Sequence, residues 1–158
     1  MYFIRFAGCA VKECVLHPAR NGWCDTDWSV SQILKGESAL EDLAKEAVAN
    51  VGASGWICIT GGEPLSQPVA FKELVYQLKQ KPLSLEVETS GLDPLPEDEL
   101  FDQVDSWVVD VKTPSSGMVK FLRLDDLNRL RKCDQVKFVV QTVEDLEFAA
   151  NIINQSVG

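Results

Sequence analysis

The chain has 158 residues, of which 46% are hydrophobic and 25% are charged, and its formal net charge is −9. This length predicts one domain, residues 1–158, and the composition is that of a soluble globular protein. The negative charge argues against a nucleic-acid partner, because proteins that bind phosphate backbones concentrate Lys and Arg on one face. No apolar run approaches the ~18 residues of a membrane span, and no signal peptide is visible. We therefore expect a cytoplasmic protein with no membrane partner.

Apolar periodicity predicts strands that alternate with helices along the chain. The predicted strands cover residues 2–7, 56–60, 83–89, 106–110 and 135–141. The predicted helices cover residues 38–51, 69–79, 96–101, 124–130 and 143–153. Ser38 and Glu41 have the spacing of a capping box for the first helix, and Thr142 is placed to cap the last. This alternation predicts an α/β fold with about five parallel strands and helices on the outside.

Each unusual segment of the sequence follows a predicted strand. In chain order these segments are a cysteine-containing loop from Cys9, Gly61-Gly62-Glu63-Pro64, Glu88-Thr89-Ser90-Gly91 and Asp110-Val111-Lys112. In sheets of parallel strands the ligand site lies beyond the carboxyl ends of the strands. The four segments therefore predict one ligand site at one edge of the sheet.

Three cysteines, Cys9, Cys14 and Cys24, lie close together in the first loop. In the cytoplasm such thiols bind metal or catalyse more often than they cross-link. Together with His17 they would form a Cys₃His zinc site, whereas the three thiolates alone would suit a 4Fe–4S cluster with one iron left open. Their spacing does not separate these alternatives. Cys58 lies inside an apolar strand, and we expect it to be a buried, inert thiol.

The later segments also have two interpretations each. The glycines of Gly61-Gly62-Glu63-Pro64 either form a simple tight turn or let the backbone approach a ligand, and the carboxylate would suit an ammonium or guanidine-like group rather than phosphate. Glu88-Thr89-Ser90-Gly91 could merely cap its strand. Asp110 and Lys112 could form an ordinary ion pair. Arg5, inside an apolar strand, either reaches water at a sheet edge or pairs with an anionic ligand.

In combination the motifs are more specific than any one of them. The chain resembles the radical S-adenosylmethionine enzymes, and within them it looks like the 7-carboxy-7-deazaguanine synthases of queuosine and deazapurine biosynthesis. The segments that carry the likeness are Phe3–Cys9, Trp23-Cys24-Asp25-Thr26, Thr60–Pro64, Glu88–Gly91 and Asp110–Gly117. The resemblance implies a single domain of the radical S-adenosylmethionine type with a partial (β/α) barrel.

The resemblance also implies a cofactor set and a role for individual residues. Three cysteines would hold a 4Fe–4S cluster, S-adenosylmethionine would bind its open iron, and the resulting 5′-deoxyadenosyl radical would abstract hydrogen from the substrate. The implied cluster ligands are Cys9, Cys14 and Cys24. The positions implied to bind S-adenosylmethionine are Trp23, Asp25, Gly62, Glu63, Ser90, Asp110 and Lys112. Thr26 matches a Mg²⁺ ligand, and Arg5 and Thr60 match substrate-binding positions. The implied reaction is conversion of 6-carboxy-5,6,7,8-tetrahydropterin to 7-carboxy-7-deazaguanine with loss of ammonia.

The chain departs from the family pattern in three places. Four and then nine residues separate the clustered cysteines, which leaves Cys14 and His17 as alternatives for the middle ligand. The family's N-terminal Gln-Gly-Glu-Gly segment and its C-terminal histidine-bearing tail are missing, so the domain is expected to be minimal or truncated at both ends. A homodimer could close the barrel, and an external donor such as flavodoxin or ferredoxin would supply electrons. The competing interpretations are a radical enzyme with another substrate, such as an activase or maturase, and a zinc-stabilised binding module.

Overall fold

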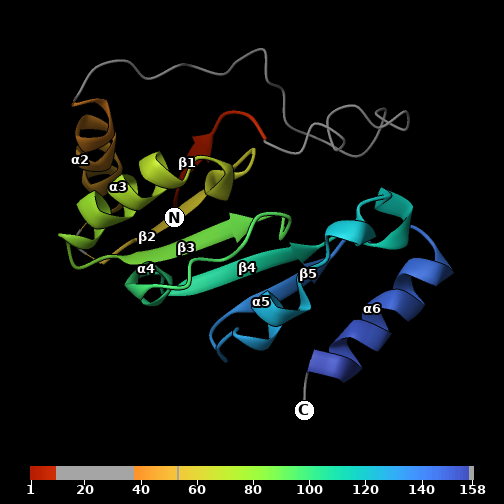
Figure 1. Cartoon of the computed structure of the whole chain (residues 1–158). Coiled ribbons are helices and arrows are strands. Elements are labelled where there is room, and N and C mark those ends of the chain that lie inside the picture. Colours follow the sequence, from red (N-terminus) through yellow and green to blue (C-terminus); the bar gives the residue numbers. More distant parts are fainter. Residues whose placement is uncertain (10–37, 53, 157–158) are drawn as a thin grey trace.

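The computed structural model describes residues 1–9, 38–52 and 54–156, which form a parallel sheet with its helices (Figure 1). The strands are β1 (Tyr2–Phe6), β2 (Trp56–Gly61), β3 (Ser84–Thr89), β4 (Ser106–Val111) and β5 (Gln135–Phe138). The α-helices are α2 (Ala39–Val51), α3 (Pro68–Lys79), α4 (Glu99–Gln103), α5 (Leu124–Asn128) and α6 (Val143–Ser156). Short 3₁₀ helices cover Pro64–Ser66 (η2), Pro114–Ser116 (η3) and Val119–Phe121 (η4). In this part of the chain no helix is long and apolar enough to cross a membrane.

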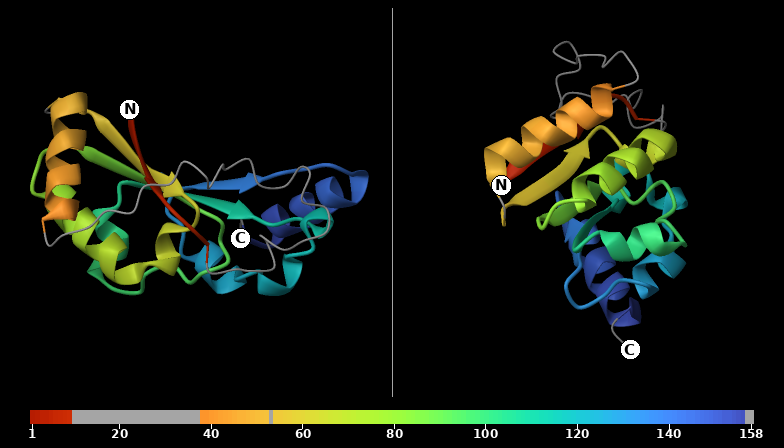
Figure 2. Two further views of the ribbon diagram at one scale, coloured as in Figure 1. Left: turned by 90° about the horizontal axis from the view of Figure 1, so that it is seen from above. Right: turned by 90° about the vertical axis from the view of Figure 1, so that its left-hand side faces the viewer.

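The five strands lie in the order of the sequence, β1-β2-β3-β4-β5, and every neighbouring pair is parallel. Connections between parallel strands are right-handed, so a sheet that always adds its next strand on the same side carries its connecting helices on one face. α2 and α6 consequently lie at opposite ends of the molecule (Figures 1 and 2). The prediction of an α/β fold with five parallel strands is confirmed, and the described sheet is open rather than closed.

Residues alternate between the two faces of each strand. On the helix-covered face β3 contributes Leu85 and Val87, which are fully buried. Glu86 and Glu88, which alternate with them and belong to the other face, are half-buried. The core continues into the helices through Phe71 and Leu74 of α3. None of the described helices covers the opposite face of the sheet, called the helix-free face below, which carries Arg5, Thr60, Glu86 and Glu88.

Aromatic packing anchors the helical layer to β4. The ring of Trp107 stacks on Phe101 of α4 with a centroid separation of 5.6 Å, and its indole nitrogen donates a hydrogen bond to the Phe101 carbonyl oxygen at 3.1 Å. The guanidinium groups of Arg129 and Arg131 lie 5.0 and 4.9 Å from the Phe101 ring centroid. Phe101 is thus held by its contacts in the core and by two guanidinium groups, which are attracted electrostatically to the face of its ring.

Several predicted boundaries are corrected. The helix expected over 96–101 begins at Glu99, because Asp98 accepts a hydrogen bond from the Leu100 amide at 3.1 Å and acts as its N-cap. The strand expected over 135–141 ends at Phe138, since Phe138 pairs with Val111, the last residue of β4, and no ladder partner remains beyond it. α5 ends two residues before the expected position, at Asn128.

The two predicted helix caps have different outcomes. Ser38 makes no capping bond to the backbone, and its hydroxyl donates to Asp42 at 3.1 Å, while Glu41 pairs with Lys45 at 2.7 Å. The predicted capping box of Ser38 and Glu41 is therefore wrong. Thr142 caps α6 as expected, because its hydroxyl accepts a hydrogen bond from the Asp145 amide at 3.2 Å.

Candidate functional site at the carboxyl edge of the sheet

The turn after β2 is organised by the buried carboxylate of Glu63, which is 1% exposed. One oxygen accepts hydrogen bonds from the Leu65 amide at 3.0 Å and the Thr89 hydroxyl at 2.8 Å. The other accepts from the Ser90 amide at 2.7 Å and the Ser90 hydroxyl at 2.5 Å. The structure thus brings together two sequence motifs that lie 27 residues apart. Glu63 holds the turn after β2 against the end of β3, and its predicted contact with S-adenosylmethionine stays a prediction.

The same turn is bound to the chain that precedes Cys9. The Gly62 amide donates to the Phe6 carbonyl oxygen at 2.7 Å, and the Glu63 amide donates to the Gly8 carbonyl oxygen at 3.0 Å. Gly61 makes this approach possible, since a Cβ atom there would lie 2.3 Å from the Phe6 oxygen and its φ is +114°. The beginning of the cysteine loop is therefore fixed beside the backbone of Gly62 and Glu63.

Arg5 and Thr60 lie side by side on the helix-free face, because they are paired residues of β1 and β2. Arg5 is exposed, whereas Thr60 is 7% exposed. The Thr60 hydroxyl donates a hydrogen bond to Glu88 of β3 at 2.8 Å. A cation, a hydroxyl and a carboxylate thus lie on one surface, next to the carboxyl ends of three strands.

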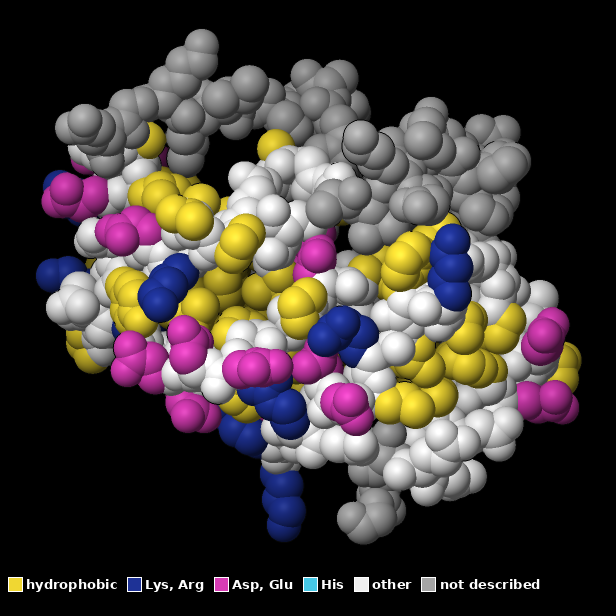
Figure 3. Space-filling view, in the orientation of Figure 1, with side chains coloured by type: hydrophobic (Ala, Val, Ile, Leu, Met, Phe, Trp, Pro, Cys, Tyr) yellow, Lys and Arg dark blue, Asp and Glu magenta, His cyan; other side chains and the backbone are white. Residues whose placement is uncertain are grey.

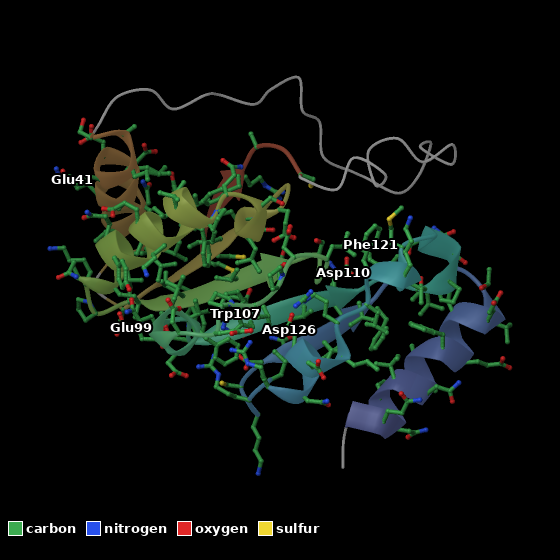
Figure 4. The ribbon with its side chains drawn as sticks, in the orientation of Figure 1. Glu41, Glu99, Trp107, Asp110, Phe121 and Asp126 are labelled. Atoms are coloured by element: carbon green, nitrogen blue, oxygen red, sulfur yellow. The ribbon has the colours of Figure 1, made fainter. Side chains whose placement is uncertain are left out.

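Asp110 and Lys112 lie at the end of β4, where Figure 4 shows Asp110 further along the strand than Trp107. Lys112 Nζ lies 2.8 Å from Asp110 Oδ2, so the ion pair considered from the sequence is present. The second oxygen, Oδ1, is buried and accepts no hydrogen bond from the described residues. Lys112 also lines a pocket together with Gly91 and Arg123. Asp110 does not line this pocket, but a buried carboxylate oxygen without a donor among the described residues can accept a hydrogen bond from a ligand.

Cys58 is fully buried, as the sequence predicts. Burial raises the pKa of its thiol to about 12, and the nearby carboxylates of Glu88 and Glu86 add to the increase. The thiol is therefore protonated at neutral pH when no metal ion is bound. Its sulfur and one oxygen of each glutamate lie within 4.8 Å of one another.

From the sequence, Glu86 is not singled out, and Glu88 is noted only as part of the motif Glu88-Thr89-Ser90-Gly91. The signal that could have found them is the alternation in Ser84-Leu85-Glu86-Val87-Glu88-Thr89, which places both carboxylates on one face of a strand. The remaining predicted site residues, Cys14, Cys24, Trp23, Asp25 and Thr26, lie outside the described residues, as does His17.

The geometry defines a class of protein. It is an α/β protein whose parallel strands run in sequence order and present polar side chains on the helix-free face and at the carboxyl edge, the arrangement of partial (β/α) barrels. No protein-family model matches the chain.

Curated relatives identify the family. The chain is 32% identical over 153 residues to the 7-carboxy-7-deazaguanine synthase of Clostridium acetobutylicum, covering 97% of this chain and 65% of the relative. It is 36% identical over 153 residues to the enzyme of that name from Methanospirillum hungatei, covering 96% and 57%. For that of Thermoplasma acidophilum the identity is 32% over 160 residues, covering 98% and 68%. The chain belongs to the 7-carboxy-7-deazaguanine synthase family, and it spans between 57% and 68% of the length of these relatives.

Proposed function

We propose that this chain is a radical S-adenosylmethionine enzyme that converts 6-carboxy-5,6,7,8-tetrahydropterin to 7-carboxy-7-deazaguanine with loss of ammonia. The observation that carries the proposal is the placement of Arg5, Thr60 and Glu88 together on the helix-free face. This substrate has a carboxylate at one end and a guanidine-like edge at the other. A guanidinium and a carboxylate on one surface complement these two ends by charge-assisted hydrogen bonds. The shared name of the relatives supports the same reaction.

In this proposal Arg5 binds the substrate carboxylate. Its exposed side chain belongs to β1, an edge strand of the described sheet, and lies in the row of Thr60. Arg suits this role because its planar guanidinium donates two parallel hydrogen bonds to a carboxylate. Thr60 orients Glu88, whose other oxygen is then available to accept hydrogen bonds from the guanidine-like edge.

For the cofactors we propose that Cys9, Cys14 and Cys24 hold a 4Fe–4S cluster and that S-adenosylmethionine binds along the carboxyl edge. When bound, these groups would supply the one-electron chemistry that removes hydrogen from the substrate. The described residues suit such groups, because Cys9 follows a segment hydrogen-bonded to Gly62 and Glu63, and Asp110 keeps one buried oxygen without a partner. We further propose Thr26 as a Mg²⁺ ligand beside the substrate oxygens.

We also propose a homodimer and an external electron donor of the flavodoxin or ferredoxin type. Exposed apolar side chains of β5, of α6 and of the segment between them offer a surface for the second copy, and hydrophobic side chains are visible at the end of the molecule where α6 lies (Figure 3). The exposed residues are Val136, Val139, Val140, Val143, Leu146 and Ile153. Light scattering of the purified protein measures the oligomeric state directly.

The experiment is anaerobic reconstitution with iron and sulfide, followed by incubation with S-adenosylmethionine and a strong reductant. We expect a brown protein that forms 5′-deoxyadenosine, and 7-carboxy-7-deazaguanine once the pterin and Mg²⁺ are added. Formation of 5′-deoxyadenosine without the deazaguanine would indicate a radical enzyme with another substrate. A colourless zinc protein would overturn the radical chemistry altogether.

The Arg5→Ala variant tests the substrate site separately. Loss of a charge-assisted contact of about 1.5–3 kcal/mol predicts a decrease in kcat/KM for the pterin of about 10- to 100-fold, with unchanged iron content. Lys132→Ala is the matched control, because Lys132 is an exposed cation before β5, at the other edge of the sheet. If Arg5→Ala lowered the cluster content instead, the role assigned to Arg5 would be wrong.

A further inference from the structure

One group of side chains on the helix-free face has no role in the proposed cofactor set. It consists of Cys58 on β2 and Glu86 and Glu88 on β3. Cys58 and Glu86 are paired residues of the parallel ladder, and Glu88 lies two positions further along the same strand. The register of the sheet therefore brings a thiol and two carboxylates to one point.

The three ligand atoms, Cys58 Sγ and one oxygen from each glutamate, lie within 4.8 Å of one another. Around a tetrahedral zinc ion the donor atoms are separated by roughly 3.5 Å, as Zn–S and Zn–O bond lengths of about 2.3 and 2.1 Å require. Cys58 is fully buried, whereas both glutamates are half-buried, so solvent reaches the group through the carboxylates.

We propose that Cys58, Glu86 and Glu88 form a binding site for a thiophilic divalent cation of the zinc class. One sulfur and two oxygens complete three tetrahedral positions and leave the fourth for water. The sulfur favours a zinc-class ion over Mg²⁺ or Ca²⁺, which take oxygen ligands. On binding, the metal–sulfur bond replaces the S–H bond, and the thiol proton passes to solvent.

The position of this site gives it a consequence for turnover, which rests on the proposed function. Glu88 also accepts the Thr60 hydrogen bond, and Thr60 is paired with Arg5 in the proposed substrate site. A cation on Glu88 would neutralise the carboxylate proposed to accept the guanidine-like edge of the substrate. We therefore expect a zinc-class ion to inhibit competitively with the pterin.

Cobalt(II) is the probe, because a cobalt–thiolate bond gives a near-ultraviolet charge-transfer band. All 158 residues are kept, with Cys9, Cys14 and Cys24 replaced by Ala, so that no thiol of the predicted cluster contributes. We expect one equivalent of Co²⁺ to bind with that band and with the visible spectrum of a tetrahedral ion. Absence of the band, or octahedral visible bands alone, would overturn the site.

Two further variants in the same background assign the ligands. Cys58→Ser should abolish the band, and Glu86→Gln should weaken Co²⁺ binding by about tenfold or more. Cys133→Ser is the matched control and should leave the band unchanged, because Cys133 is exposed and adjacent to Asp134 rather than to this group. Loss of the band in Cys133→Ser, or its survival in Cys58→Ser, contradicts the proposal.

These spectra do not depend on catalysis, so the two proposals fail separately. If Cys58→Ser does not fold by circular dichroism, Glu86→Gln and Glu88→Gln decide the matter through the Co²⁺ dissociation constant. Unchanged affinity in both would overturn the site. If Co²⁺ binds at this site but the protein forms no deazaguanine, the metal-site proposal is supported. Only the proposed competition between the metal ion and the pterin is then contradicted.

Discussion

The Thr89 hydroxyl donates a hydrogen bond of 2.8 Å to the buried carboxylate of Glu63, and so joins the ends of two adjacent strands. Three further donors, the Leu65 amide and the amide and hydroxyl of Ser90, bind the same carboxylate. Both of its oxygens must therefore act as acceptors to satisfy these donors. An amide at this position would direct N–H groups against other donors.

Glu63→Gln should therefore lower the free energy of unfolding by about 1–3 kcal/mol, the cost of leaving buried donors unsatisfied. Urea denaturation at neutral pH measures the loss. The control is Glu73→Gln on the exposed side of α3, which should change stability by less than about 0.5 kcal/mol. Equal stability of the two variants would show that the charge at Glu63 is not needed for folding.

Gly61→Ala should be more damaging than Gly52→Ala. The added Cβ would meet the Phe6 carbonyl at 2.3 Å and force an unfavourable φ, so we expect a loss of about 2–5 kcal/mol. Gly52→Ala has a positive φ but no atom within 4 Å, and should cost only about 1–2 kcal/mol. Hydrogen exchange of β1 amides should rise only in Gly61→Ala, and comparable exchange in both variants would contradict this explanation.

Asp145 should make the stability of the protein depend on acid pH. Burial alone would raise the pKa of its carboxyl, but hydrogen bonds from Ser115, Gln141 and Thr142 outweigh burial and hold it well below 3.8. A lowered pKa in the folded state contributes stability that is fully present above pH 3.8 and is lost as the pH falls below it.

The stability difference between the wild type and Asp145→Asn should thus be constant near neutral pH and shrink below pH 3.8. Urea midpoints measured across this range provide the test. Glu144→Gln, at the exposed neighbouring position, should follow the wild-type pH profile. A difference that grew on acidification would have the wrong sign.

Asp110→Asn separates ligand binding from stability, provided that the proposed function is correct. Its Oδ1 atom has no partner among the described residues, so within the fold the substitution changes only the contact of Oδ2 with Lys112. Binding of S-adenosylmethionine should weaken by about 10- to 100-fold in equilibrium titrations. Asp102→Asn, exposed on α4, is the control. Unchanged affinity of Asp110→Asn for S-adenosylmethionine would show that Asp110 Oδ1 does not bind this ligand.

The sequence predicts the order of elements well because β-strands and helices differ in apolar period, as the alternation in 84–89 illustrates. It fails where a local pattern competes with tertiary contacts. Ser38 and Glu41 have capping-box spacing, yet both side chains bond to charged or polar neighbours on the helix surface. The end of β5 depends on where β4 ends, which no local pattern contains.

The candidate site shows the same limit. Motif positions locate Glu63 and Ser90 at strand ends, but only the folded chain shows that they bond to each other. Likewise, the position of Cys58 opposite Glu86 follows from strand register, which depends on packing between distant segments.

The strand order has a consequence for how the chain acquires its structure. Each strand pairs only with the strand before and after it in the sequence, so no strand must wait for a distant one. Such a sheet can grow by successive addition of strand–helix units during synthesis, because short loop closures cost little entropy. We expect the earliest native contacts to arise within these units, with β1 and β2, which 49 intervening residues separate, as the slowest junction.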